Sequence, residues 1–232
     1  METRVVIRAK AEDAKFIGTS MGGSRVIVKD ALSGSILDQG IIRGSTGDTK
    51  RIMATPWIRG ERLADENTAC FVARLDIEEP CLVDIVVYAP YGQPQAMARA
   101  SVTTWIVPGK HIEGDGIVID FPGLVVRITE PPAHTFFQVP GRLRLAASAT
   151  PMCGCPVDMK TFWPPDAYEV GAYLKKDGEI QEILPLSFCG KRNCFETEIP
   201  IENPGDYEFI VYAFDAKTGN TGVDKTTIVA TK

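Results

Sequence analysis

Short runs of apolar residues recur along the whole chain, and Gly, Pro, Asn or Asp separates each run from the next. No stretch keeps the apolar period of an amphipathic helix for long, so strands are expected throughout. Residues 194–201 alternate most clearly: Phe195, Ile199 and Ile201 fall on one face, and Glu196 falls on the other. Such alternation predicts an antiparallel sheet with one face packed on a second sheet and the other in water.

The second half of the chain divides into a series of predicted strands. They are expected near residues 124–129, 142–149, 168–175, 180–188, 194–201, 206–214 and 223–230. Lys175–Glu179 and Asp215–Asn220 are predicted hairpin turns, because Asp-Gly and Gly-Asn supply the positive φ that tight turns need. The fold class is therefore expected to be all-β.

The chain contains an internal repeat at a shift of 124 positions. Cys70–Ala89 then aligns with Cys194–Ala213, and eight of the 20 aligned pairs are identical. With one gap, Thr103-Thr104 aligns with Thr226-Thr227. A period of this length indicates a tandem pair of domains, because solenoid repeats are only about 20–50 residues long.

The repeat fixes the predicted domain boundaries. Residues 1–108 form the first domain and residues 117–232 the second, and residues 109–116 form a polar, glycine-bearing linker. Further back in each copy, Arg25–Val28 resembles Arg142–Leu145. Each domain is therefore expected to hold one copy of the same unit.

The segment Asn203–Asp215 resembles the E–F corner of immunoglobulin-like and fibronectin type III-like domains. In those domains a tyrosine early in strand F turns its hydroxyl back onto the corner backbone, and Tyr207 stands at that place. The first copy has Val83 there, so its corner must close by packing alone. The resemblance implies two tandem Ig-like antiparallel β-sandwich domains, a fold that by itself specifies no function.

Charge and hydropathy exclude two classes of partner. The 232 residues carry a formal net charge of −5, and no stretch gathers Lys and Arg into a stripe. A nucleic-acid partner is therefore not expected. The longest apolar runs, such as Ile85–Ala89, have the length of a strand and fall far short of a bilayer span. Membrane insertion is therefore not expected.

The two indicators of compartment disagree. The N-terminus runs from Met1 almost directly into Val5-Val6-Ile7, with no signal-peptide core. The even number of cysteines, six, instead favours an oxidising compartment or a metal site. An extracytoplasmic location is the favoured expectation, and a cytoplasmic one is the alternative.

Four cysteines in the second copy carry the sharpest candidate chemistry. They are Cys153, Cys155, Cys189 and Cys194. Gathered at one pole of the second domain, they would form two disulfides or a thiolate site for Zn²⁺ or Cu(I). The Cys-x-Cys spacing is tighter than that of most structural zinc sites, which favours disulfides from this loop to the other two. No cofactor beyond such a metal ion is expected.

Two further cysteines flank a predicted turn in the first copy. Cys70 and Cys81 could pair with each other across that turn. The alternative is that both are small, half-buried residues without a disulfide. Both interpretations stay open on the sequence.

Two aromatic segments are candidate contact surfaces. Phe162-Trp163 lies on a proline-stiffened loop beside the cysteines, and Trp57 lies in the long unpatterned region 43–68. Exposed aromatic side chains suit a protein interface or a sugar-stacking platform. For Phe162-Trp163 the favoured interpretation is instead a loop folded over the end of the core. Trp105, on the last strand of the first copy, is predicted to lie in the core.

The chain contains no G-x-S-x-G motif, no Walker loop, no H-E-x-x-H motif and no C-x-x-C-H motif, and nothing nominates a catalytic pair of carboxylates. The expected function is therefore a non-catalytic structural or binding module that contacts a protein partner or a larger assembly. The alternative from another class is a metal-handling or redox protein that uses the four cysteines. A weaker alternative is a carbohydrate-binding module. The second copy carries most of these features, so its pole is the expected site.

Overall fold

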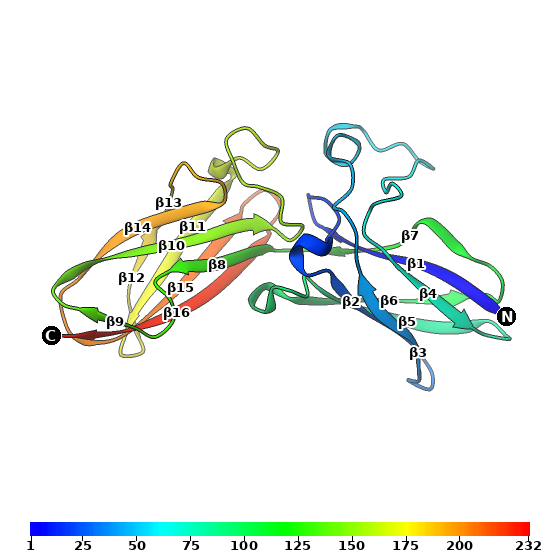
Figure 1. Ribbon diagram of the computed structural model, residues 1–232, viewed down its shortest axis with the longest axis horizontal. Helices are drawn as coiled ribbons and strands as arrows, with labels where there is room; N and C mark the ends of the chain where they lie inside the picture. Colours follow the sequence, from blue (N-terminus) through cyan, green and yellow to red (C-terminus); the bar gives the residue numbers. More distant parts are fainter. The chain divides into compact units, whose positions relative to one another are not determined.

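The computed structural model describes residues 1–232 and is built almost entirely from strands (Figure 1). It divides into two compact units. Unit 1 comprises Met1–Pro122 and Met152–Gly154, and unit 2 comprises Gly123–Pro151 and Cys155–Lys232. The helices are single short turns, and none has the length and apolar character needed to span a membrane.

Unit 1 is a sandwich of two sheets. Its strands are β1 (Glu2–Ala11), β2 (Ser24–Asp30), β3 (Ile36–Ile42), β4 (Phe71–Asp76), β5 (Cys81–Ala89), β6 (Ala98–Ile106) and β7 (Ile112–Phe121). Three short helical turns are η1 (Thr19–Met21), η2 (Lys50–Ala54) and η3 (Pro94–Ala96). One sheet has the order β4-β1-β7 and the other β3-β2-β5-β6. Alternate side chains of β1, such as Val5, Ile7 and Ala9, are buried in the core.

Unit 2 has the same two-layer design with more strands. They are β8 (Leu124–Glu130), β9 (Thr135–Gln138), β10 (Gly141–Pro151), β11 (Tyr168–Lys176), β12 (Glu179–Pro185), β13 (Ser187–Phe188), β14 (Cys194–Ile201), β15 (Gly205–Asp215) and β16 (Thr221–Thr231), with one helical turn, η4 (Pro165–Ala167). The sheets have the orders β13-β14-β10-β8 and β12-β11-β15-β16-β9. The all-β, Ig-like sandwich prediction is confirmed.

The repeat is visible in the strand registers. Asp84 on β5 pairs with Thr103, and Glu208 on β15 pairs with Thr227. Thr103 and Thr227 are 124 positions apart, so the same shift extends through β6 and β16 and the predicted gap is not needed. The backbone pairing, unlike the side-chain identities, fixes this register.

The further match of Arg25–Val28 with Arg142–Leu145 was wrong. Arg25–Val28 belongs to β2, which pairs with β5, whereas Arg142–Leu145 belongs to β10, which pairs with β14. The strand of unit 1 equivalent to β10 is β1, because β1 pairs with β4 as β10 pairs with β14. Short apolar strands resemble one another, so their sequence similarity did not identify the equivalent element.

The predicted linker, residues 109–116, includes part of β7, and unit 1 extends to Pro122 rather than to residue 108. β7 runs parallel to β1, with Ile7 opposite Ile117 and Ala11 opposite Phe121. In unit 2 the equivalent neighbour of β10 is β8, which is antiparallel and precedes it. Unit 1 therefore completes its smaller sheet with its last strand, and unit 2 begins with the corresponding strand.

Tyr207 forms the corner contact that the Ig-like resemblance implies. Its hydroxyl donates a hydrogen bond to the backbone carbonyl of Asn203 at 2.8 Å, and its side chain is buried. Burial is the main cause that raises the pKa of this tyrosine, and the nearby charge of Asp177 raises it further. In unit 1 the equivalent Val83 is fully buried and contributes no such hydrogen bond.

Replacing Tyr207 by Phe is expected to destabilise unit 2. The substitution keeps the ring but removes the donor to Asn203, which costs about 1 kcal/mol. Denaturant unfolding of the full chain measures the loss. Tyr91→Phe is the matched control, because Tyr91 is a surface residue of unit 1. Equal unfolding curves for the two variants would contradict a stabilising role for the corner.

Candidate functional site

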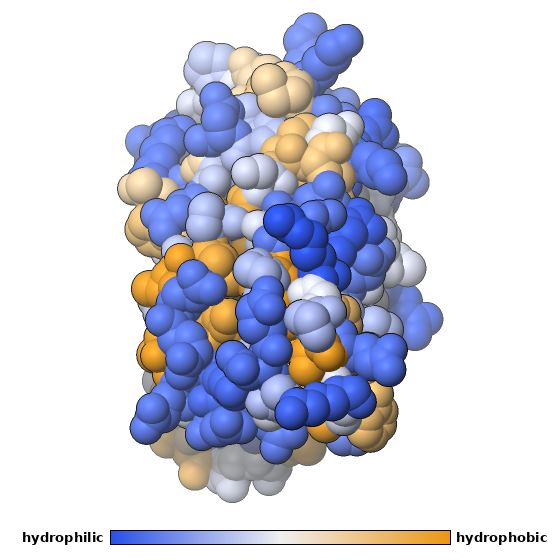
Figure 2. Space-filling model, turned by 90° about the vertical axis from the view of Figure 1, so that its left-hand side faces the viewer, coloured by the Kyte–Doolittle hydropathy of each residue, from blue (hydrophilic) through white to orange (hydrophobic).

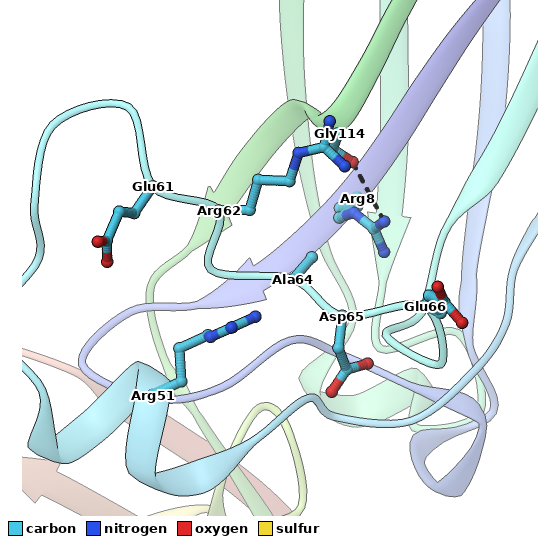
Figure 3. Close-up of a pocket in the computed structure, with 8 residues that line it drawn as sticks. All are labelled: Arg8, Arg51, Glu61, Arg62, Ala64, Asp65, Glu66 and Gly114. Atoms are coloured by element: carbon cyan, nitrogen blue, oxygen red, sulfur yellow. Dashed lines mark hydrogen bonds between the residues drawn. The ribbon is translucent and has the colours of Figure 1, made fainter.

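One outer face of unit 1 carries a pocket of about 600 Å³. It is lined by Arg8, Arg51, Glu61, Arg62, Ala64, Asp65, Glu66 and Gly114. These residues come from β1, from η2, from the segment between β3 and β4, and from β7 (Figure 3). Segments far apart in the sequence therefore meet at one charged cavity.

The pocket lies over the outer face of β1. The side chain of Arg8 leaves β1 on the outer face of the sheet, whereas Ile7 and Ala9 point into the core. Arg8 is nevertheless only 6% exposed. The segment that follows η2 covers it. Asp115 on β7 holds this segment in place, because its carboxylate accepts backbone hydrogen bonds from Leu63 at 2.8 Å and Ala64 at 2.9 Å.

Arg8 is held mainly by backbone carbonyl groups. Its Nη1 donates hydrogen bonds to the carbonyls of Thr68 and Ala69, and its Nη2 donates a long one, 3.4 Å, to the carbonyl of Gly114. The guanidinium also lies 5.9 Å from the ring centre of Phe16. Its Nε is buried without a hydrogen-bond partner.

A bulge in β7 brings Gly114 to the pocket. The pairing with β1 passes from Val5–Ile112 directly to Ile7–Ile117, so residues 113–116 bulge out opposite Val6. Gly116 adopts a φ of +71°, and a Cβ there would lie 2.2 Å from the carbonyl oxygen of Val6. Only glycine fits at this position.

The rim of the pocket carries both signs of charge. Figure 3 shows Arg62 extending toward Gly114 and Arg51 reaching from η2 toward the loop that carries Ala64. Neither arginine forms an ion pair. A hydrogen bond from the Thr68 hydroxyl is the main cause that lowers the pKa of Asp65, so this carboxylate is ionised at neutral pH.

A second candidate site, in unit 2, is a pair of thiols. Cys189 and Cys194 face each other across the turn after β13, where the Cys189 amide donates a hydrogen bond to the Cys194 carbonyl at 3.0 Å. Their sulfur atoms and a carboxylate oxygen of Glu196 lie within 4.8 Å of one another. Cys189 and Glu196 also line a cavity of about 350 Å³. Cys153 and Cys155 are buried and do not belong to this group.

The six cysteines form no disulfide in the structure, so the predicted bridges are not confirmed. Cys70 and Cys81 do not pair in the structure, where they lie at different ends of the sandwich. Cys70 precedes β4, whereas Cys81 begins β5 in the other sheet, so the length of β4 separates them. The Cys81 thiol instead donates a hydrogen bond to Asp30 at 3.3 Å. Burial is the main cause that raises the pKa of Cys81, and the Asp30 carboxylate raises it further.

The Cys194 thiol is expected to resist alkylation at neutral pH. Burial, and then a hydrogen bond with Cys189, raise its pKa to about 11. Its thiolate fraction, and with it the rate of reaction with iodoacetamide, should rise about tenfold per pH unit between pH 8 and 10. Peptide mass spectrometry after timed labelling measures that rate, with the urea-unfolded chain as control. A rate that levels off below pH 9 would contradict the raised pKa.

The three tryptophans differ widely in exposure. Trp163 is only 6% exposed, so it lies in the core end and is no surface for a partner or a sugar. Its neighbour Phe162 is half exposed and contacts it edge to face. Trp57 is 69% exposed. Trp105, predicted as core, is 60% exposed because it falls on the outer face of β6.

The sequence did not single out the residues that build the arginine-lined pocket. Arg8 interrupts an otherwise apolar run, Val5–Ala11, and a charged residue within such a run was the available signal. Asp115 and Gly114 were assigned to the linker. Their composition, Glu-Gly-Asp-Gly, is typical of turns as well as of bulges.

The fold and the sites define a pair of immunoglobulin-like or fibronectin type III-like β-sandwich units, the first of which carries a charged pocket on one outer face. No protein-family model matches the chain, and no curated protein matches it. Its similarity to solved structures is low in sequence and in superposition.

Three of these structures illustrate the similarity. Fibronectin(III)-like modules of Clostridium thermocellum CbhA share 12% identity over 99% of this chain and 94% of that chain, with a TM-score of 0.33. The titin domains Z1Z2, solved in complex with telethonin, share 13% identity over 99% and 94%, with a TM-score of 0.28. An engineered protein shares 16% identity over 51% of this chain, with a TM-score of 0.36, and the chain spans only 22% of its length.

Proposed function

We propose that this protein is a non-catalytic module that binds a protein partner through the segment between β3 and β4 of unit 1. The observation that carries the proposal is the exposure of Trp57 and Ile58. Every residue from 54 to 62 is exposed, and the two large apolar side chains stand in the middle of this run. We call residues 54–62 the exposed loop.

The composition of the exposed loop supports a protein partner. Tryptophan and arginine are the residues most enriched at the energetic centres of protein interfaces. Trp57 is flanked by Pro56 and followed closely by Arg59 and Arg62. An exposed tryptophan on a monomer has little to gain from water, and burial against a partner would stabilise the complex.

Unit 2 offers a weaker case for such a contact. The end of unit 2 that faces the viewer in Figure 2 is mostly hydrophilic, with hydrophobic residues in smaller patches between charged ones. The exposed apolar side chains of unit 2 include Ile180 and Ile183 on the edge strand β12. Scattered apolar residues of this kind are normal on protein surfaces.

The test compares Trp57→Ser with a matched variant, Ile180→Ser, which removes an exposed apolar side chain of unit 2. Proteins captured from extracts of the source cells are identified by quantitative mass spectrometry, and the captured protein is then purified. The expected result is a dissociation constant at least about tenfold weaker for Trp57→Ser and unchanged for Ile180→Ser. Equal affinity of both variants, or loss only with Ile180→Ser, would overturn the proposal.

A second proposed function, binding of Zn²⁺, rests on Cys189, Cys194 and Glu196. Two thiols and a carboxylate at this spacing are a suitable partial ligand set for Zn²⁺. Glu196 would first have to leave Arg144, whose Nη2 lies 2.5 Å from it. Titration with Zn²⁺ and intact mass spectrometry test this function. Cys189→Ser should abolish stoichiometric binding and Cys70→Ser should not, whereas equal binding by both variants would overturn it.

A further inference from the structure

Arg8 is a buried cation with one side of its guanidinium only weakly bonded. In a guanidinium group, the Nε–H bond and one Nη2–H bond point to the same side and form a fork. In Arg8 the Nε has no partner, and the Nη2 has only the 3.4 Å contact with Gly114. The Nη1, in contrast, donates hydrogen bonds to two carbonyl oxygens.

The pocket is lined by Arg8 and by Gly114, the two residues of the weak Nη2 contact. Gly114, the partner of Nη2, lines the pocket, whereas Thr68 and Ala69, the partners of Nη1, do not. A buried charge without a counter-ion is costly, and a fork of donors beside a cavity can be matched by an anion with two oxygens. No carboxylate of this chain pairs with Arg8, although Asp65 and Glu66 line the same pocket.

We propose that this pocket binds a carboxylate group, which the Nε and Nη2 of Arg8 receive in a two-point contact. Arg62 and Arg51 provide the second and third cations at the rim. This inference rests on the proposed function, because the pocket adjoins the exposed loop: Glu61 and Arg62 belong to both. The carboxylate is then an acidic side chain of the protein partner that contacts the exposed loop.

Two features favour a carboxylate over a phosphate. The planar carboxylate matches the guanidinium fork, and it carries a single negative charge. The pocket already holds Glu61, Asp65 and Glu66, so its three arginines are balanced by three acids. A doubly charged phosphate would face these acids at close range and be repelled more strongly than a singly charged group.

The Nε–H signal of Arg8 allows a direct test by ¹H–¹⁵N NMR on the full chain. The probes are sodium acetate, inorganic phosphate, and a short end-blocked peptide with a single Glu, each against sodium chloride at equal ionic strength. A saturable shift of the Arg8 Nε–H signal is expected with acetate and with the peptide, and a weaker one with phosphate. Arg62→Gln should weaken acetate binding about three- to tenfold.

Arg8→Lys removes the two-donor fork of the guanidinium but keeps a positive charge. In this variant the amide signals of residues 63–69 and Gly114 report on binding and on folding. The expected result is a dispersed spectrum without a saturable shift. A response of wild type to chloride alone, tighter binding of phosphate than of acetate, or an unchanged acetate response in a folded Arg8→Lys chain would each overturn the inference.

Binding of the partner and binding of acetate, measured for two variants, distinguish the carboxylate site from the exposed loop. Trp57→Ser should weaken binding of the protein partner at least about tenfold but keep the acetate shift, whereas Arg8→Lys should weaken partner binding and lose the acetate shift. A folded Arg8→Lys chain that binds the partner as tightly as wild type refutes the carboxylate role and leaves the exposed loop as the contact. An acetate shift with no response to the peptide indicates a free carboxylate as the ligand and refutes the side-chain source.

Discussion

Shortening the chain to residues 1–108 is expected to leave unit 1 without stable tertiary structure, whereas residues 1–122 are expected to fold. The shorter chain lacks β7, whose Ile119 and Phe121 are buried in the core and whose backbone completes the sheet beside β1. Losing a buried Phe alone costs about 3–5 kcal/mol, against a total of about 5–15 kcal/mol for a domain. Denaturant unfolding and the dispersion of amide NMR signals measure the difference.

A point variant tests the same strand in the full chain. Phe121→Ala should lower the stability of unit 1 by about 3–5 kcal/mol. Phe136→Ala is the matched control, because Phe136 is largely exposed on β9 of unit 2, and it should change stability by less than about 0.5 kcal/mol. If residues 1–108 unfold cooperatively with the same midpoint as residues 1–122, β7 is not part of the folding unit.

The sandwich fold was predictable because its signals are local. Alternation along a strand and the Asp-Gly turn need only neighbouring residues, and the repeat through β4, β5 and β6 was strong enough to show two copies. The last strand of unit 1 was not predictable in this way. Residues 113–116 have the composition of a linker, and only their pairing with β1 makes them a bulge.

The candidate site was less predictable than the fold, because it depends on contacts between distant residues. Arg8 receives its carbonyl partner from Thr68, 60 positions away, and nothing in its own strand indicates that a loop will cover it. The two tryptophans show the same limit. Trp105 alternates onto the outer face of β6, whereas Trp163 is buried at the end of its loop.

The proposed site lies in unit 1, whereas the sequence directed the expectation to the pole of the second copy. The chemistry of Cys153, Cys155, Cys189 and Cys194 is visible in the sequence, and the structure groups Cys189 and Cys194 with Glu196. In the unpatterned region 43–68 the sequence singled out Trp57 alone. The same region also supplies two arginines of the pocket and the cover over Arg8.

Gly116→Ala is expected to disrupt the pocket and unit 1 together. An L-residue at a φ of +71° costs about 1–2 kcal/mol, and the new Cβ would lie 2.2 Å from the carbonyl oxygen of Val6. The backbone of Val6 cannot move away as a flexible side chain could, because Val6 lies between paired residues of β1. The expected loss of stability is therefore above about 3 kcal/mol, with the Gly114 carbonyl displaced from Arg8.

Gly60→Ala separates the two causes of that loss. Gly60 has a φ of +89°, but no atom lies within 4 Å of the position a Cβ would take. Its substitution should therefore cost only the conformational term, about 1–2 kcal/mol at most. Thermal unfolding of both variants, with the Arg8 Nε–H signal as a second readout, gives the comparison. If Gly116→Ala is no more destabilising than Gly60→Ala and leaves the Arg8 signal unmoved, the bulge does not position the pocket.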